Sequence, residues 1–102
     1  MAYKVIITEQ AQNNFYARID YVRLILCEER AAEDLYAKYN SFIEKVSILP
    51  EIYLKLQDER LLNHSLRRAL IKNYVAVYEF NGETVTVLGF YHQKQDYARF
   101  CL

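Results

Sequence analysis

The chain has 102 residues and a mass of 12.2 kDa, and its thirteen Lys and Arg residues balance its thirteen Asp and Glu residues. Aromatic residues at 15%, with only two Gly and one Pro, exclude a disordered or linker-rich chain. A net charge of zero also disfavours a protein that holds nucleic acid through bulk charge alone. The length is typical of one domain with one hydrophobic core, so we expect a single domain over residues 1–102.

Signals for membrane insertion, export, disulfide formation and metal binding are missing from the sequence. No run of about eighteen apolar residues occurs, and the N-terminus lacks the apolar core of a signal peptide, so we expect a cytoplasmic protein without a membrane contact. Cys27 and Cys101 lie 74 positions apart without a CxxC motif, and we expect two free thiols. Potential metal ligands are not clustered, so we expect neither a metal nor a cofactor.

A strand and the start of a helix are predicted at the N-terminus. Alternating side chains over residues 3–8 indicate a strand that is buried on at least one face. Thr8 is a candidate N-cap for the helix that follows, and Glu9 places a negative charge in its first turn. The chain therefore opens as a strand that leads directly into a helix.

Apolar residues at steps of three and four indicate two amphipathic helices. The stripes are Phe15, Ile19, Val22 and Leu26 in the first helix, and Leu35, Tyr39, Phe42, Val46 and Leu49 in the second. The acidic stretch 28–34 joins them as a turn and a first helical turn, and Pro50 ends the second helix. The short connection predicts an antiparallel helical hairpin.

The second half of the sequence predicts a three-stranded antiparallel meander. Residues 51–64 lack a clear period and are expected to form a loop with one helical turn or an edge segment. The expected strands are 65–72, 74–80 and 84–92, with a tight hairpin at Asn81-Gly82 and a short helix in the tail from 93 to 102. On the last strand we expect Val85, Val87, Gly89 and Tyr91 to share a face. The predicted fold class is α+β, with the helical hairpin packed on one face of a mainly antiparallel sheet.

Charge is unevenly distributed along the chain. A basic segment without an acid comprises Arg60, Arg67, Arg68 and Lys72, with His64 nearby, whereas residues 28–34 hold four acids against one base. A basic strand can contact phosphates or an acidic protein. It can equally be a solvated sheet edge whose cations keep it soluble and unpaired.

The adjacent pair Arg67 and Arg68 must face opposite sides of a strand. One of the two therefore points toward the helices or their rim, where an unpaired guanidinium is costly. That arginine either forms a structural ion pair, with an acid such as Glu9 or Asp20, or lines a concave site.

The segment after the last strand, His92 to Tyr97, places an imidazole, an ammonium, a carboxylate and a phenol within six residues. Such groups can act as general acid or base, or stabilise charge on a phosphate. The alternative is structural: Asp96 caps the last helical turn, Tyr97 packs, and His92 merely ends the strand.

Four segments of the sequence, in order, carry a family resemblance. They are the strand 3–8 with Ala11 in the following helical turn, the helix exit Ile48-Leu49-Pro50, the stretch 66–78 and the stretch 85–97. The third contains an arginine-rich strand, an Asn-Tyr turn and a Tyr-x-x-x-Tyr strand, and the fourth ends in a His…Asp-Tyr tail. Together they resemble the RelE/ParE superfamily of bacterial toxins from type II toxin-antitoxin systems.

The resemblance implies a growth inhibitor of the plasmid-stabilisation type that is neutralised by a cognate antitoxin protein. RelE-like members cleave ribosome-bound mRNA, and ParE-like members inhibit DNA gyrase by binding. For an mRNA endoribonuclease, the resemblance implies that Arg67 and Lys94 hold the scissile phosphate while His92 or Tyr97 assists proton transfer. For a binding protein, the target- or phosphate-binding residues are those of the basic strand, and none is catalytic. They are Arg60, Arg67, Arg68 and Lys72.

Two departures from the family pattern bear on the target. Lys94 and Gln95 stand where the tail usually has paired arginines, and the net charge is zero where ribosome-dependent nucleases are basic. The long helical hairpin is also more similar to ParE. We therefore expect gyrase inhibition, with mRNA cleavage as the alternative and an inactive interaction module as a third possibility. Whether the chain is an enzyme, and its oligomeric state, stay open.

Overall fold

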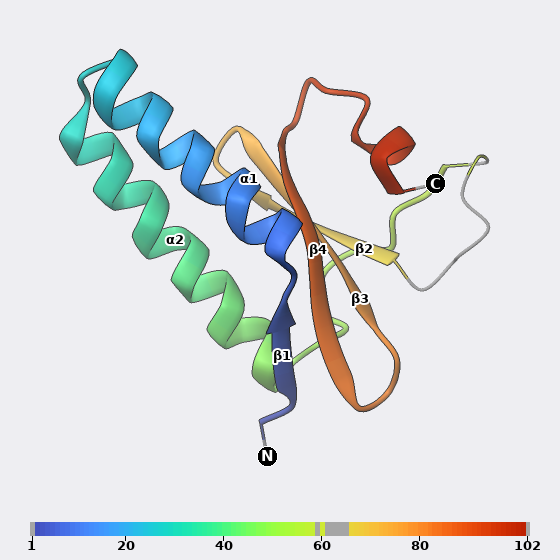
Figure 1. The fold of residues 1–102 in the computed structure, drawn as a ribbon. Coiled ribbons are helices and arrows are strands. Elements are labelled where there is room, and N and C mark those ends of the chain that lie inside the picture. Colours follow the sequence, from blue (N-terminus) through green and yellow to red (C-terminus); the bar gives the residue numbers. More distant parts are fainter. Residues whose placement is uncertain (1, 59, 61–65, 102) are drawn as a thin grey trace.

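The computed structural model describes residues 2–58, 60 and 66–101, and it contains one sheet, two long helices and two short helical segments. In chain order the elements are β1 (Lys4–Ile7), α1 (Glu9–Asp20), the π-helical η1 (Tyr21–Ile25), α2 (Glu29–Ile48), β2 (Leu66–Ile71), β3 (Tyr74–Phe80), β4 (Thr84–His92) and the 3-10 helix η2 (Tyr97–Cys101). The sheet order is β1-β4-β3-β2, with β1 parallel to β4 and the other pairs antiparallel. Figure 1 shows α1 and α2 side by side along one side of this sheet, which confirms the predicted α+β fold.

The helical hairpin begins at the predicted cap. The Thr8 hydroxyl accepts a hydrogen bond from the Ala11 amide at 3.1 Å and donates one to the Val87 carbonyl at 3.0 Å. The first α-helix is shorter than the predicted stripe, which ran to Leu26, because the backbone becomes π-helical after Asp20, in η1. The second helix starts at Glu29 and ends at Ile48, just before Pro50. None of the helices in the described ranges is long and apolar enough to cross a bilayer.

Aromatic rings fill the space between the helical hairpin and the sheet. The rings of Phe15 and Tyr39 stack at 4.0 Å, and Phe90 of β4 meets both edge-on, at 5.3 and 5.4 Å. The buried members of this core are Ala11, Phe15, Ile19, Leu35, Tyr39, Phe42, Val46, Ala69, Ile71, Ala76, Tyr78, Val85, Val87 and Phe90. Both predicted helical stripes contribute to it, but their last members do not: Leu26 and Leu49 were expected on the buried faces and are 47% and 55% exposed.

A bulge in β4 overturns one prediction about which residues share a face. Val77 pairs with Gly89 but Tyr78 pairs with Val87, which leaves Leu88 as an extra residue on β4. An extra residue reverses the facing of everything beyond it. Val85 and Val87 therefore face the helices, while Gly89 and Tyr91 face the other way, and the expected common face is wrong.

The second face of the sheet is also partly covered. Leu56, Leu66, Val75, Val77 and Tyr91 form a smaller buried cluster there, against which Leu88 and Tyr97 pack. A Cβ added at Gly89 would overlap the Tyr91 ring, so glycine permits this ring to lie across the strand. We call this side of the sheet the cleft face.

The segment before β2 pairs with its outer edge. The Leu56 amide donates to the Leu66 carbonyl at 2.8 Å, the Arg68 amide donates to the Leu54 carbonyl at 3.0 Å, and Lys55 bridges Arg67. Of the two alternatives for residues 51–64, the edge segment is therefore observed over Leu54–Leu56. His64, expected beside the basic segment, and Ser65, expected to begin the first strand of the meander, lie outside the described residues.

Two buried tyrosines provide a test of the core. The Tyr78 hydroxyl is buried and donates to the Pro50 carbonyl at 2.7 Å, whereas the buried Tyr39 hydroxyl has no hydrogen-bond partner within the described residues. Tyr78→Phe leaves a buried carbonyl unsatisfied, so we expect it to lower the free energy of unfolding by about 1–3 kcal/mol.

Tyr39→Phe is the matched control, and it should leave the free energy of unfolding unchanged or raise it, because it removes a desolvated hydroxyl that has no hydrogen-bond partner among the described residues. Urea denaturation of the two variants measures both effects. Equal losses in the two variants would contradict this account of the Tyr78–Pro50 contact.

Candidate functional site: the basic segment and the cleft face

Arg67 lies on the helix side of β2 and forms a structural contact. Its side chain is 14% exposed, and Nη1 donates to the carbonyls of Tyr53 at 2.7 Å and Glu51 at 3.3 Å. Nη2 also lies 3.6 Å from the Glu51 carboxylate. Of the two alternatives for the helix-side arginine, an ion pair or the lining of a concave site, the structure shows the ion pair, and its partner is Glu51 and not Glu9 or Asp20. Arg67 thereby anchors the segment after α2 to the sheet.

Lys72 joins the basic segment to the acidic one. It lies in the turn between β2 and β3, with φ of 57°, and not at the end of the expected strand. Its Nζ is 2.6 Å from a carboxylate oxygen of Asp34, which also lies 3.6 Å from Lys38 Nζ. The Lys72 hydrogen bond keeps the pKa of Asp34 below its usual value. The two charged segments therefore neutralise each other where they meet.

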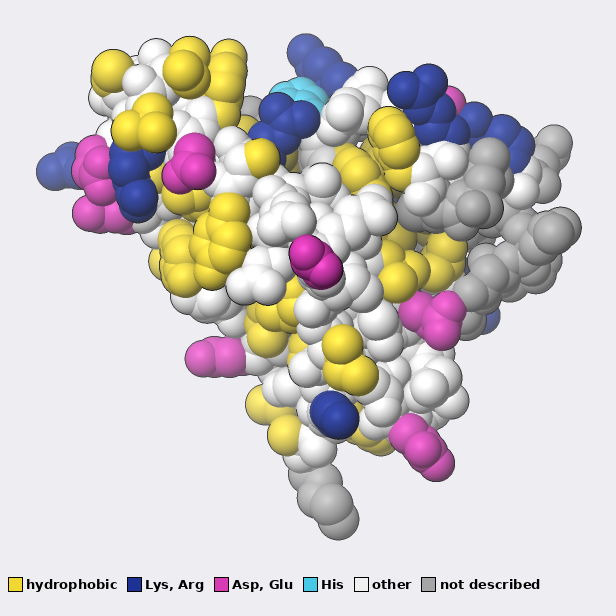
Figure 2. Space-filling view, viewed as in Figure 1, with side chains coloured by type: hydrophobic (Ala, Val, Ile, Leu, Met, Phe, Trp, Pro, Cys, Tyr) yellow, Lys and Arg dark blue, Asp and Glu magenta, His cyan; other side chains and the backbone are white. Residues whose placement is uncertain are grey.

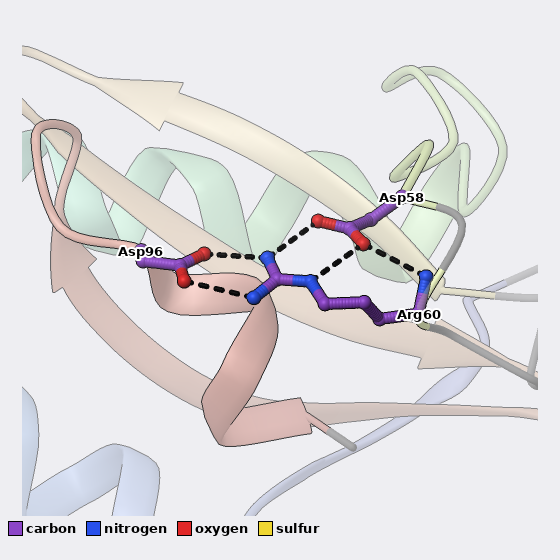
Figure 3. A network of polar contacts seen from close by, with 3 residues as sticks. All are labelled: Asp58, Arg60 and Asp96. Atoms are coloured by element: carbon purple, nitrogen blue, oxygen red, sulfur yellow. Dashed lines mark hydrogen bonds and ion pairs between the residues drawn. The ribbon is translucent and has the colours of Figure 1, made fainter.

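Arg60 lies between two carboxylates (Figure 3). Its guanidinium donates two hydrogen bonds to Asp96, at 2.6 and 2.8 Å, and two to Asp58, at 2.7 and 2.9 Å. These bonds lower the pKa of Asp58 to about 2 and also lower that of Asp96. The Asp96 carboxylate thus clamps the C-terminal tail to the segment before β2, a role that differs from the expected helix cap.

Arg68 is the member of the basic segment that faces the cleft side. Its Nη1 lies 3.4 Å from the Tyr97 hydroxyl, a long hydrogen bond. Between the edge segment and η2 lies a cleft of about 480 Å³, lined by Leu54, Lys55, Leu56, Gln57, Arg68 and Tyr97. Lys55 was not identified from the sequence. The alternation of Leu54, Lys55 and Leu56 was the available signal, but this segment is too short for a reliable period.

The tail after β4 is arranged as a compact turn. The Lys94 amide donates to His92 Nδ1 at 3.1 Å, and the His92 amide donates to the Gln95 side-chain oxygen at 2.9 Å. The His92 ring contacts Tyr74 edge-on at 5.6 Å, whereas the Tyr97 ring lies parallel to Tyr91 at 6.5 Å. Because Tyr74 packs on the helix-side core and Tyr91 belongs to the cleft face, His92 and Tyr97 lie on opposite sides of the sheet.

The four residues expected to be catalytic in a nuclease are therefore not assembled at one point. In the sheet register, Arg67 lies opposite Tyr78, near the end of β3. His92 lies opposite Tyr74, the first residue of β3, so the two residues are at different ends of the sheet. Tyr97 meets Arg68 on the other face. Among the described residues no group of three or more His, Cys, Asp or Glu side chains is placed to hold a metal ion.

The Arg60 clamp has a pH dependence that can be measured. Because its carboxylates have lowered pKa values in the folded state, the clamp stabilises the fold above their unfolded pKa of about 4, and this contribution is lost toward pH 2. We expect Arg60→Gln to lower the urea midpoint at neutral pH, and the difference from the wild type to shrink between about pH 4 and pH 2. A difference that is independent of pH would contradict the clamp.

Comparisons with known proteins give one family model and several solved structures that are similar to this chain. The model of the ParE toxin of the type II toxin-antitoxin system parDE matches residues 5–97. No curated protein matches the sequence significantly.

Three solved structures share the fold. A chain of the chromosomal ParDE system from P. aeruginosa superposes with a TM-score of 0.67 at 15% identity. The alignment covers 89% of this chain and 96% of the ParDE chain. The archaeal RelE-RelB complex from Pyrococcus horikoshii OT3 has a TM-score of 0.59 at 17% identity, covering 93% and 99%. The RelBE2 toxin-antitoxin complex from Mycobacterium tuberculosis has a TM-score of 0.56 at 18% identity, covering 90% and 99%. Because the family model spans nearly the whole chain, this protein belongs to the ParE toxin family of type II toxin-antitoxin systems.

Proposed function

We propose that residues 1–102 form a single-domain cytoplasmic toxin that arrests growth by binding DNA gyrase, with no catalytic residue of its own. The observation that carries this proposal is the internal pairing of the basic segment. Three of its four cations are held by carboxylates of the same chain: Arg60 by Asp58 and Asp96, Arg67 by Glu51, and Lys72 by Asp34. A nuclease needs cations that are free to stabilise charge on the scissile phosphate. The paired state of these cations favours a binding protein.

The mRNA endoribonuclease is the alternative, and one observation favours it. Arg68, Lys55 and Tyr97 line the same cleft, where two cations and a phenol are in reach of a phosphate. In that function Arg68 and Lys55 would bind the phosphate and Tyr97 would be the proton-transfer candidate. The expected pair of Arg67 and Lys94 would then be replaced by residues of the cleft face.

The partner that neutralises this toxin is, in our proposal, a cognate antitoxin that docks on the surface shared by β2 and the segment that pairs with its outer edge. Ile52, Leu54 and Leu70 are 52%, 74% and 58% exposed there, around a hollow of about 230 Å³ that Arg68 also lines. We call these three side chains with Arg68 the edge patch. Apolar side chains around a cation fit an amphipathic segment with acidic residues. The three similar structures come from toxin-antitoxin systems, which supports such a partner.

A paired assay of the purified protein tests the function. We expect the wild type to inhibit DNA supercoiling by gyrase and to leave ribosome-bound mRNA uncut. Because neither side chain is catalytic in this proposal, His92→Ala and Lys94→Ala should inhibit gyrase within about twofold of the wild type.

Three other outcomes would overturn the proposal. Cleavage of mRNA that is abolished by Arg68→Ala or Tyr97→Phe would establish the endoribonuclease at the cleft. Cleavage abolished by Arg67→Ala or Lys94→Ala would place the reaction at the residues expected from the sequence. A protein that changes neither gyrase nor mRNA, and does not slow growth when expressed, would be an interaction module.

The edge patch is tested by antitoxin affinity. The antitoxin is identified as the product of a small reading frame adjacent to the toxin gene. We expect Leu54→Ser combined with Leu70→Ser to weaken binding about tenfold or more, because two exposed apolar contacts are lost, and Arg68→Ala to make binding less sensitive to salt. Isothermal titration at two salt concentrations measures both effects. Unchanged affinity in both variants would rule out this surface.

A further inference from the structure

The free end of the helical hairpin carries an unusual group of exposed apolar side chains. Tyr21, Leu24, Ile25 and Leu26 are 45%, 67%, 67% and 47% exposed, and all four lie within six consecutive residues. We call these four residues the hairpin tip. Figure 2 shows hydrophobic side chains gathered at this end of the molecule, above a band of charged side chains. A contiguous apolar patch of this kind on a soluble domain usually marks an interaction surface.

The local backbone explains why these side chains point outward. Up to Ile19 the first helix buries one residue per turn against the sheet and α2, and Val22 is the last buried position. From Tyr21 to Ile25 the chain is π-helical, and the wider turn shifts the apolar residues out of the helical stripe. This explains why Leu26, expected on the buried stripe, is 47% exposed. Single π-helical turns are frequent at functional sites.

The charges beside the hairpin tip are mostly acidic. Residues 23–34 contain Glu28, Glu29, Glu33 and Asp34 against Arg23 and Arg30. Arg23 is already paired with Glu29 at 3.3 Å, and Asp34 is paired with Lys72 at 2.6 Å. Of the remaining charges, Glu28, Glu33 and Arg30 are all exposed at the start of α2, so the rim of the tip keeps a net negative charge.

The negative charge around the hairpin tip indicates which kind of partner can bind there. An acidic rim repels anionic lipid, nucleic acid and the identical rim of a second copy. The acidic rim also repels the acidic antitoxin segment that we propose for the edge patch. A protein pocket that is apolar at its centre and basic at its rim is the remaining match.

We propose that the hairpin tip is the surface through which this toxin binds its target enzyme, and that it enters an apolar pocket of gyrase rimmed by Lys or Arg. This inference rests on the proposed function, and it names the contact that the proposed function requires. An enzyme that holds DNA carries basic surface along its DNA path, so a pocket of this character is expected beside it. The apolar side chains supply affinity, and the acidic rim accelerates association and orients the two proteins.

Matched pairs of variants at the two ends of the hairpin test the proposal. Leu24→Ser with Ile25→Ser alters the hairpin tip, and Ile48→Ser with Leu49→Ser is the control, since these residues are 60% and 55% exposed at the opposite end of α2. For the charge, Glu28→Lys with Glu33→Lys is compared with Glu44→Lys, an exposed acid near the control end. All substituted side chains are exposed, so each variant should fold, as circular dichroism and antitoxin binding will verify.

We expect the Leu24/Ile25 variant to need about tenfold or more protein for half-inhibition of supercoiling, because it loses two apolar anchors, while its antitoxin affinity is unchanged. The Glu28/Glu33 variant should bind gyrase more weakly at low salt and approach the wild type at high salt. Both control variants should match the wild type.

Each failure has a distinct signature. A wild type that does not inhibit gyrase overturns the proposed function itself. A wild type that inhibits gyrase, with tip variants that inhibit equally well, overturns only the hairpin tip. Loss of antitoxin binding in the tip variants, with gyrase inhibition retained, would reassign the tip to the antitoxin.

Discussion

Each residue of the sheet faces either the helical hairpin or the cleft, and this constraint governs the rest of the structure. On the hairpin side, stacked and edge-on rings of Phe15, Tyr39 and Phe90 hold the two layers together. On the cleft side, Tyr91 and Tyr97 cover a smaller apolar cluster. Polar side chains are then divided between the two sides by their position along each strand. Arg67 becomes a structural anchor and Arg68 a surface group solely because they are neighbours on β2.

The balance of positive and negative charge in the sequence is accompanied by ion pairs within the fold. Several acids and bases that are far apart in the sequence form ion pairs in the fold. Arg60 holds the C-terminal tail through Asp96, and Lys72 holds the start of α2 through Asp34. Much of the positive charge that a phosphate-binding protein would direct outward is thus used to fasten the chain to itself. Such pairs are modest contributors to stability when exposed, but they fix the position of the segments they join.

The two exposed apolar surfaces differ in position and in charge. The edge patch lies beside β2 with a cation, and the hairpin tip lies at the free end of the helices with acids around it. A toxin must recognise both a target and an antitoxin, and two surfaces of opposite character allow each partner to be chosen independently. In this proposal the electrostatic difference between them prevents the acidic antitoxin segment from occupying the target surface.

The sequence by itself determined the fold class, the two helical stripes, the Thr8 cap, the helix end at Pro50 and the family resemblance. The fold class, the stripes, the cap and the helix end depend on local propensity and on periodicity, which a single chain displays directly, whereas the resemblance depends on four short sequence segments in order. The bulge at Leu88, the Glu51 partner of Arg67, the cleft with Lys55 and the clamp around Arg60 required the tertiary structure. In each case the deciding contact joins residues separated by a loop or a strand register, and register shifts of one residue reverse which face a side chain occupies. The basic character of residues 60–72 was therefore visible in the sequence, but only folding decided that most of it would be neutralised from within.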